Sequence, residues 1–110
     1  MKSLKFRPHL IPMILGGDKT VTWRLFDDKN ISAGDSLSFL NWSDGAEFAQ
    51  ATATSIEETS LISLWPDKLQ GHEKFENFPE MLSNYKLYYG DRVNEDTIVK
   101  IINFKIEKAP

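Results

Sequence analysis

The sequence contains no cysteine among its 110 residues. Disulfides, cysteine nucleophiles and thiolate metal sites are therefore excluded. The two histidines, His9 and His72, are too few for a histidine-rich zinc site, and a serine–histidine triad would have to use one of them. We therefore expect neither a metal nor a cofactor.

Long apolar runs are also missing. No stretch approaches the roughly 20 consecutive apolar residues of a membrane span, and the N-terminal residues lack the apolar core of a signal peptide. We expect a cytoplasmic protein without a membrane partner. Hydrophobic residues make up 41% of the chain and charged residues 26%, which is enough for a packed core in one domain over residues 1–110.

The net charge is small, −3, but its distribution is uneven. Residues 1–24 hold five basic residues and one acidic residue, a local net charge of +4; the remainder holds 8 basic and 15 acidic residues, a net charge of −7. A small anionic ligand or a short stretch of nucleic acid would meet a positive face at the N-terminal part. Solvated surface lysines explain the same pattern equally well.

Alternating apolar residues and turn signals predict a mixed α+β fold that is mainly β. We expect strands over 4–6, 20–26, 36–41, 47–58 and 97–107, and short helices over 12–15, 60–65 and 77–89. Asn77 and Glu80 have the spacing of a helix cap. These elements predict a small β-barrel of about five to six strands with two or three short helices covering it, and a split α+β sandwich is the competing architecture.

The segment 16–24, "GGDKTVTWR", raises the question of a site. Its glycines are typical of a helix end, and its β-branched residues are typical of a strand. Alternation along that strand places Val21 and Trp23 in the core and Thr20, Thr22 and Arg24 together on an exposed face. An ordinary exposed strand face explains this row as well as a binding site does.

Lys19 directly precedes this polar row and is a candidate general base for one of its threonines. A threonine hydroxyl becomes a nucleophile when a neighbouring base takes its proton, and a lysine can be that base. Residues three apart on a straight strand point to opposite faces. Lys19 therefore lies beside Thr22 only if the turn at residues 18–19 redirects its side chain.

The segment 14–24, "ILGGDKTVTWR", resembles the signature of ASCH domains, whose fold is a PUA-like β-barrel. The pattern there is an apolar turn followed by glycine, lysine, Thr-x-Thr and arginine. Further matches follow in the same order: a Gly34-Asp35 turn that opens a strand, Glu73 before a helix ending in Tyr88-Tyr89-Gly90, and a last strand over 98–106. The resemblance covers nearly the whole chain.

Among small ASCH proteins, the resemblance is to bacterial amidohydrolases that convert N(4)-acetylcytidine to cytidine. It implies a catalytic set of Lys19, Thr22 and Glu73, with a nucleoside as the small-molecule substrate. The candidate substrate-binding residues are Arg24, Thr20, Asn41 and His72. Segments 39–51 and 63–75 depart from that group, which leaves the substrate preference open.

Structural explanations that need no functional site also account for Glu73 and Arg24. Glu73 lies in a charged loop, so it is also explained as a solvated acid. Arg24 would hold a pyrimidine carbonyl, a ribose or a phosphate, or stabilise an oxyanion; the alternative is a buried ion pair with an acid such as Asp35.

Two other function classes remain open. In a non-catalytic RNA-binding module, the basic N-terminal third would meet phosphates, and Trp23, Trp42 or Tyr88 would stack on a base. In a metal-independent ribonuclease, Lys19 and Arg24 would act on the phosphate backbone. The sequence supports the ribonuclease least.

Overall fold

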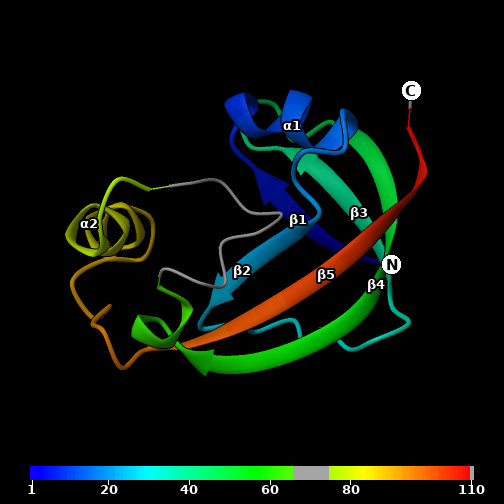
Figure 1. Cartoon of the computed structure of the whole chain (residues 1–110). Coiled ribbons are helices and arrows are strands. Elements are labelled where there is room, and N and C mark those ends of the chain that lie inside the picture. The colour runs from blue at the N-terminus through cyan, green and yellow to red at the C-terminus, as the bar shows by residue number, and fades with distance from the viewer. Residues whose placement is uncertain (66–74, 110) are drawn as a thin grey trace.

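The computed structural model describes residues 1–65 and 75–109. One five-stranded sheet dominates these residues (Figure 1). Its strands are β1 (Lys2–Phe6), β2 (Val21–Leu25), β3 (Ser36–Asn41), β4 (Glu47–Ser60) and β5 (Ile98–Lys108).

The sheet has the strand order β1-β3-β4-β5-β2, with β1 parallel to β3 and the other neighbours antiparallel. The long strands β4 and β5 run side by side and bend together, so that the sheet curls into a half-barrel (Figure 1). The mixed, mainly β fold with five strands is therefore confirmed. The described strands form one curled half-barrel sheet, which favours the barrel-like architecture over the competing split sandwich.

Short helical segments cover this sheet. They are the 3-10 segments η1 (Pro8–Leu10) and η2 (Ile62–Leu64) and the helices α1 (Ile11–Leu15) and α2 (Phe78–Tyr89). The predicted cap of α2 is confirmed, because the Asn77 Oδ1 atom accepts a hydrogen bond from the Glu80 amide at 2.8 Å. No helix within residues 1–65 and 75–109 is long and apolar enough to cross a membrane.

The core consists of two clusters. The first fills the curl of the sheet with the rings of Phe6, Phe39, Phe48 and Phe104 over three buried alanines of β4. The second lies between β2, β5, η2 and α2, where Trp23 stacks on a tyrosine of α2 with ring centroids 5.9 Å apart. This second cluster fixes the last turns of α2 beside β2.

Curling brings the two edge strands of the sheet, β1 and β2, close together. The Arg24 Nη2 atom of β2 donates a hydrogen bond to the Lys5 carbonyl oxygen of β1 at 3.0 Å. The expected exposed row on β2 is therefore only partly right. Thr20 is exposed, but Thr22 is 4% exposed because its side chain points into the space between the two edges.

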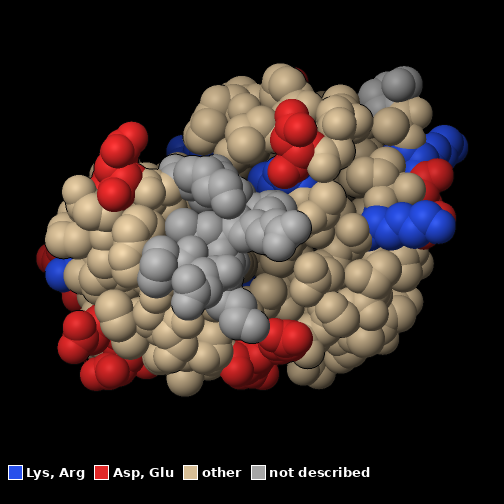
Figure 2. Space-filling model, in the orientation of Figure 1, with Lys and Arg blue, Asp and Glu red and all other residues tan. Residues whose placement is uncertain are grey.

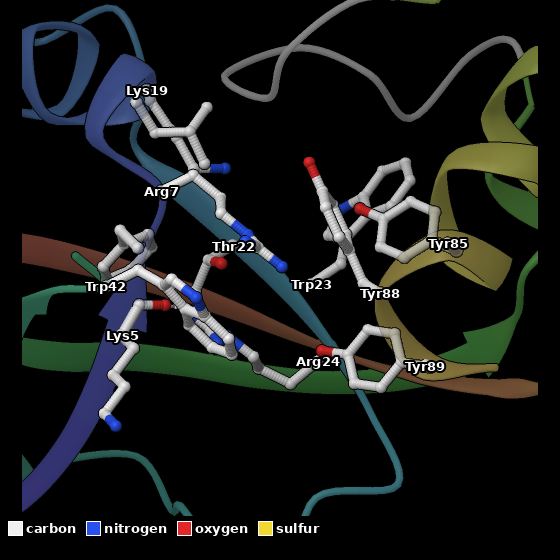
Figure 3. A pocket seen from close by; sticks show the side chains of 12 residues that line it. Lys5, Arg7, Lys19, Thr22, Trp23, Arg24, Trp42, Tyr85, Tyr88 and Tyr89 are labelled. Carbon is white, nitrogen blue, oxygen red and sulfur yellow. Dashed lines mark hydrogen bonds between the residues drawn. The ribbon is translucent and has the colours of Figure 1, made fainter.

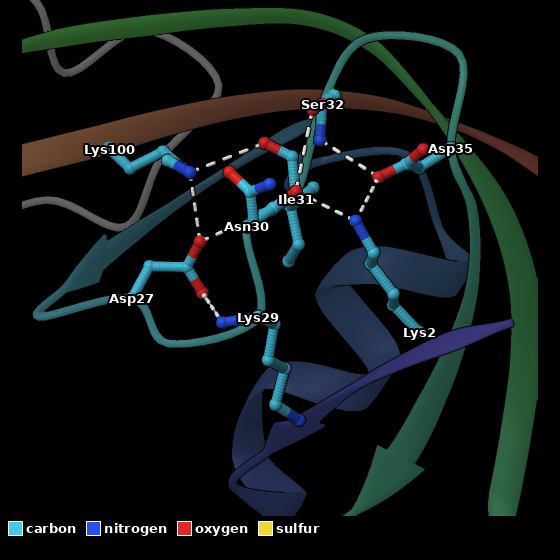
Figure 4. Close-up of polar contacts among 8 residues, drawn as sticks. All are labelled: Lys2, Asp27, Lys29, Asn30, Ile31, Ser32, Asp35 and Lys100. Carbon is cyan, nitrogen blue, oxygen red and sulfur yellow. Dashed lines mark hydrogen bonds and ion pairs between the residues drawn. The ribbon is translucent and has the colours of Figure 1, made fainter.

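The segment between β2 and β3 is tied down by two ion pairs (Figure 4). The Lys100 ammonium lies 2.9 Å from the Asp27 carboxylate, and both side chains are largely buried. Lys2 forms a more exposed pair with Asp35 at 2.8 Å. Burial raises the pKa of Asp27, but the hydrogen bonds from Lys100 and from two backbone amides outweigh it and hold that pKa below its ordinary value of 3.8.

We expect Asp27→Asn to lower the free energy of unfolding at pH 7 by about 1–3 kcal/mol, because it leaves the Lys100 charge buried without its partner. A lowered folded-state pKa stabilises the protein above the ordinary value of 3.8, and this stability is lost as pH falls through the folded-state pKa. The free energies of unfolding of the two proteins, measured by urea titration, should therefore begin to converge at about pH 4 and become equal only below the folded-state pKa of Asp27. Asp35→Asn, at the exposed pair, should change stability less; an equal loss in both variants would contradict this explanation.

Candidate functional site

A cavity of about 180 Å³ opens between the two edge strands and the last turns of α2 (Figure 3). The residues around it are mostly basic or aromatic. They are Lys5, Phe6, Arg7, Leu10, Lys19, Thr22, Trp23, Arg24, Trp42, Tyr85, Tyr88 and Tyr89.

The turn after α1 redirects Lys19 into this cavity. Gly17 ends the helix with a φ of +86°, a conformation that a glycine adopts without strain. The Lys19 amide then donates a hydrogen bond back to the Met13 carbonyl oxygen at 3.0 Å. The Lys19 side chain is 1% exposed, and its Nζ atom donates to the Val21 carbonyl oxygen at 2.9 Å. The turn that a site at Lys19 and Thr22 requires is therefore present.

Thr22 reaches the same cavity from β2. Its position in the strand is fixed by pairing with Ile102 of the neighbouring strand β5. Strand alternation sends its side chain away from the cluster that holds Trp23, toward β1. A lysine amine and a threonine hydroxyl, both buried, thus line one cavity from two different elements (Figure 3).

Arg24 lies at the cavity wall between the two edge strands. Its guanidinium carbon is 4.8 Å from the centre of the Phe6 ring, in addition to the hydrogen bond to the Lys5 carbonyl oxygen. The alternative pairing of Arg24 with Asp35 is wrong, because the Asp35 carboxylate binds Lys2 on another part of the sheet.

Two of the expected substrate-binding residues do not line the cavity. Thr20 precedes β2 and is exposed, and its carbonyl oxygen accepts a hydrogen bond from the Phe104 amide at 3.2 Å. The Asn41 Oδ1 atom accepts from the Ser43 amide at 2.8 Å and so closes the turn after β3. The next residue, Trp42, takes the place at the cavity that was expected for Asn41. Glu73 and His72 lie outside the described residues.

Sequence reasoning missed Arg7 as a site residue. Arg7 follows β1 directly and lines the cavity, yet in the sequence it contributes only to the positive charge of residues 1–24. Trp42 and Tyr88 were considered only as stacking residues for RNA. The sequence feature that Arg7, Trp42 and Tyr88 share is a position at the end of a strand or helix. Which of these ends meet in space depends on the curl of the sheet.

The described lining residues make the cavity electropositive. Four of them are cationic and none is acidic. Figure 2 shows a small basic area near the centre of this face, below α1, with an acidic side chain directly above it and further acidic side chains toward the left and lower edges. Such a cavity favours a carbonyl oxygen or a developing oxyanion. Within residues 1–65 and 75–109, no three His, Cys, Asp or Glu side chains are grouped as a metal site.

A second, wider hollow of about 420 Å³ adjoins the cavity. The two share Lys5, Arg24, Trp42 and Tyr89 as lining residues. A ligand larger than the first cavity would therefore extend into this neighbouring hollow rather than into the core.

The sequence matches no family model and no curated protein, but the fold has clear relatives among solved structures. An ASCH domain from Lactobacillus crispatus JV V101 has a TM-score of 0.68 at 16% identity over 86% of this chain and 67% of that one. An ASCH protein from Zymomonas mobilis has a TM-score of 0.70 at 14% identity over 97% and 68%.

A protein of the DUF984 family from Enterococcus faecalis V583 is similar to the same degree. Its TM-score is 0.75 at 15% identity, over 93% of this chain and 72% of that one. At such low identity the likeness concerns the fold alone. The chain has the ASCH-like, PUA-like fold that its motifs predict.

Proposed function

We propose that this ASCH-fold protein is an amidohydrolase that removes the acyl group from N(4)-acetylcytidine or a related N(4)-acylated cytosine nucleoside. One observation carries the proposal: Lys19 and Thr22 are both buried and both line one cavity. These are two of the three residues to which the sequence resemblance assigns catalysis.

The cavity suits a small planar amide. Its aromatic walls provide apolar contact for a base, and its cations provide partners for carbonyl oxygens. The ribose of a nucleoside would extend into the adjoining hollow, which the cavity meets at Arg24 and Tyr89.

In the proposed reaction, Lys19 takes the proton of the Thr22 hydroxyl, and the Thr22 oxygen attacks the acyl carbonyl carbon. The carbonyl oxygen becomes an oxyanion, which the guanidinium of Arg24 at the cavity wall stabilises. The carbon–nitrogen bond then breaks, and Lys19 returns the proton to the departing amine of cytosine. Water hydrolyses the acyl-threonine and releases the acid.

A second route keeps the same residues but forms no acyl-enzyme. Thr22 then orients a water molecule, and Lys19 takes the proton of that water as it attacks the carbonyl carbon. In both routes we assign to Glu73 the role of orienting Lys19 and relaying a proton.

The test is to incubate the purified protein with N(4)-acetylcytidine and separate cytidine from the substrate by chromatography. We expect turnover by the wild-type protein and a loss of roughly 10²–10³-fold in Glu73→Ala, because the base loses its orienting partner. Glu76→Ala removes an exposed carboxylate three residues further along the sequence and should retain activity. Full activity in all three single variants, Lys19→Ala, Thr22→Ala and Glu73→Ala, would refute the catalytic set.

A non-catalytic RNA-binding module is the second candidate. The specific observation in its favour is that Trp42 is 51% exposed and Tyr88 36% exposed at the rim of a basic cavity. No turnover of any acylated cytidine, together with RNA binding that weakens steeply with salt, would favour this candidate over the hydrolase.

A further inference from the structure

The Arg7 side chain lies across the mouth of the cavity between two aromatic rings. Its guanidinium carbon is 4.3 Å from the centre of the Trp42 ring and 5.0 Å from the centre of the Tyr88 ring. Figure 3 shows the guanidinium between these two rings, with the Thr22 hydroxyl pointing into the same space. A planar group thus occupies a slot with an aromatic wall on each side.

Stacking on these rings is the main restraint on the Arg7 guanidinium. Among residues 1–65 and 75–109, its guanidinium has no hydrogen bond or ion pair. Contacts of this kind contribute modestly when the rings are partly exposed, as Trp42 and Tyr88 are. The guanidinium can therefore leave the slot at small cost.

The slot itself is built from separate parts of the fold. Trp42 directly follows β3, where its amide donates to the Phe6 carbonyl oxygen at 2.8 Å, and Tyr88 belongs to the last turn of α2. Tyr88 also packs edge-on against the buried Tyr85. Both walls are thus anchored to ordered elements, whereas Arg7 reaches the slot only through its flexible side chain.

We propose that Trp42 and Tyr88 form the stacking slot for the pyrimidine ring of the ligand, and that Arg7 occupies this slot until the ligand displaces it. The identity of the base rests on the proposed function. A cytosine ring, like a guanidinium, is planar and stacks on aromatic faces. In the slot it would place its exocyclic nitrogen on the side of the cavity that Lys19 and Thr22 line.

Displacement has a consequence of definite sign. If Arg7 fills the slot in part of the protein molecules, only the remaining molecules can bind the ligand directly. The apparent dissociation constant is then the intrinsic constant divided by the fraction of molecules whose slot is open. Removing the Arg7 side chain should therefore tighten binding of the base. If Arg7 instead held the ligand, the same substitution would weaken binding.

The experiment measures binding of unmodified cytidine by isothermal titration calorimetry, since cytidine is not consumed by deacylation. We expect Arg7→Ala to lower the dissociation constant roughly three- to tenfold. Trp42→Ala and Tyr88→Ala should each raise it at least about fivefold, because base–aromatic stacking is lost. Trp42→Phe and Tyr88→Phe keep a ring and should bind more tightly than the alanine variants.

Two matched controls use exposed neighbours on α2 that do not line the cavity. Lys86→Ala removes a positive charge, and Leu87→Ala removes a large apolar side chain, so neither should change binding. Weaker binding in Arg7→Ala, unchanged binding in both ring-to-alanine variants, or no cytidine binding by the wild-type protein would overturn the slot. The expected binding pattern without any deacylation would support the slot and refute the hydrolase instead.

Discussion

Replacing Thr22 with alanine is expected to lower kcat/KM for N(4)-acetylcytidine at least about 10³-fold. The reason is that, in the proposed reaction, the hydroxyl attacks the carbonyl carbon or orients the attacking water. Thr22 lies between β5 and the cavity and is almost fully buried. The side chain that replaces it is smaller and apolar, so that the fold should persist while the reacting atom is lost.

Thr20 provides the matched control for this substitution. It lies two residues before Thr22, but its side chain is exposed and does not line the cavity. Thr20→Ala should therefore keep activity within about twofold of wild type, and Thr22→Ser should retain part of it because a hydroxyl remains. Equal losses in Thr20→Ala and Thr22→Ala would contradict the assignment of the reacting group to Thr22.

Lys19→Ala is the second substitution with a large expected effect. We expect kcat to fall about 10²–10⁴-fold, because general base catalysis contributes this much. The shortened side chain leaves space at a buried position of the cavity. Small primary amines added to the solution should then restore part of the activity, at least about tenfold, in a saturable manner.

Rescue by amines separates a chemical role from a structural one. The same amines should not restore Thr22→Ala, in which the group to be deprotonated is missing. Lys105→Ala removes an exposed lysine of β5 and should behave as wild type. A Lys19→Ala protein with wild-type activity, measured without added amine, would show that Lys19 is not the base.

Local features of the sequence predicted the fold well. The Asn77 cap, the Gly17 helix end and the Gly34-Asp35 turn each lie where turn and cap chemistry places them. These features depend on residues close in sequence, so a pattern of a few residues contains most of the information. The strand boundaries followed from alternation, and five strands in one sheet left few ways to bury the apolar faces.

The site was predicted less completely, because its residues meet only through the curl of the sheet. Alternation placed Thr22 correctly on the face opposite Trp23, but it could not show that β1 closes over that face and buries it. Asn41 and Trp42 are adjacent in sequence, yet only Trp42 lines the cavity. The position of the turn after β3 decides between them, and alternation does not specify it.

Arg7 shows the same limit more strongly. Its stacking on Trp42 and Tyr88 joins three segments that are distant in sequence. A basic residue in a basic N-terminal segment has many possible partners, so composition alone does not select this one. Only the three-dimensional arrangement of the edge strands and α2 reveals the slot.

The most direct test of a deacylation site at Lys19 and Thr22 is a proton NMR time course of N(4)-acetylcytidine with the purified protein. We expect the wild-type protein to release cytidine and acetate in equal amounts, and Thr22→Ala to release neither above the rate without protein. Release of both products by folded Thr22→Ala at the wild-type rate, or no release by the wild-type protein, would contradict this conclusion.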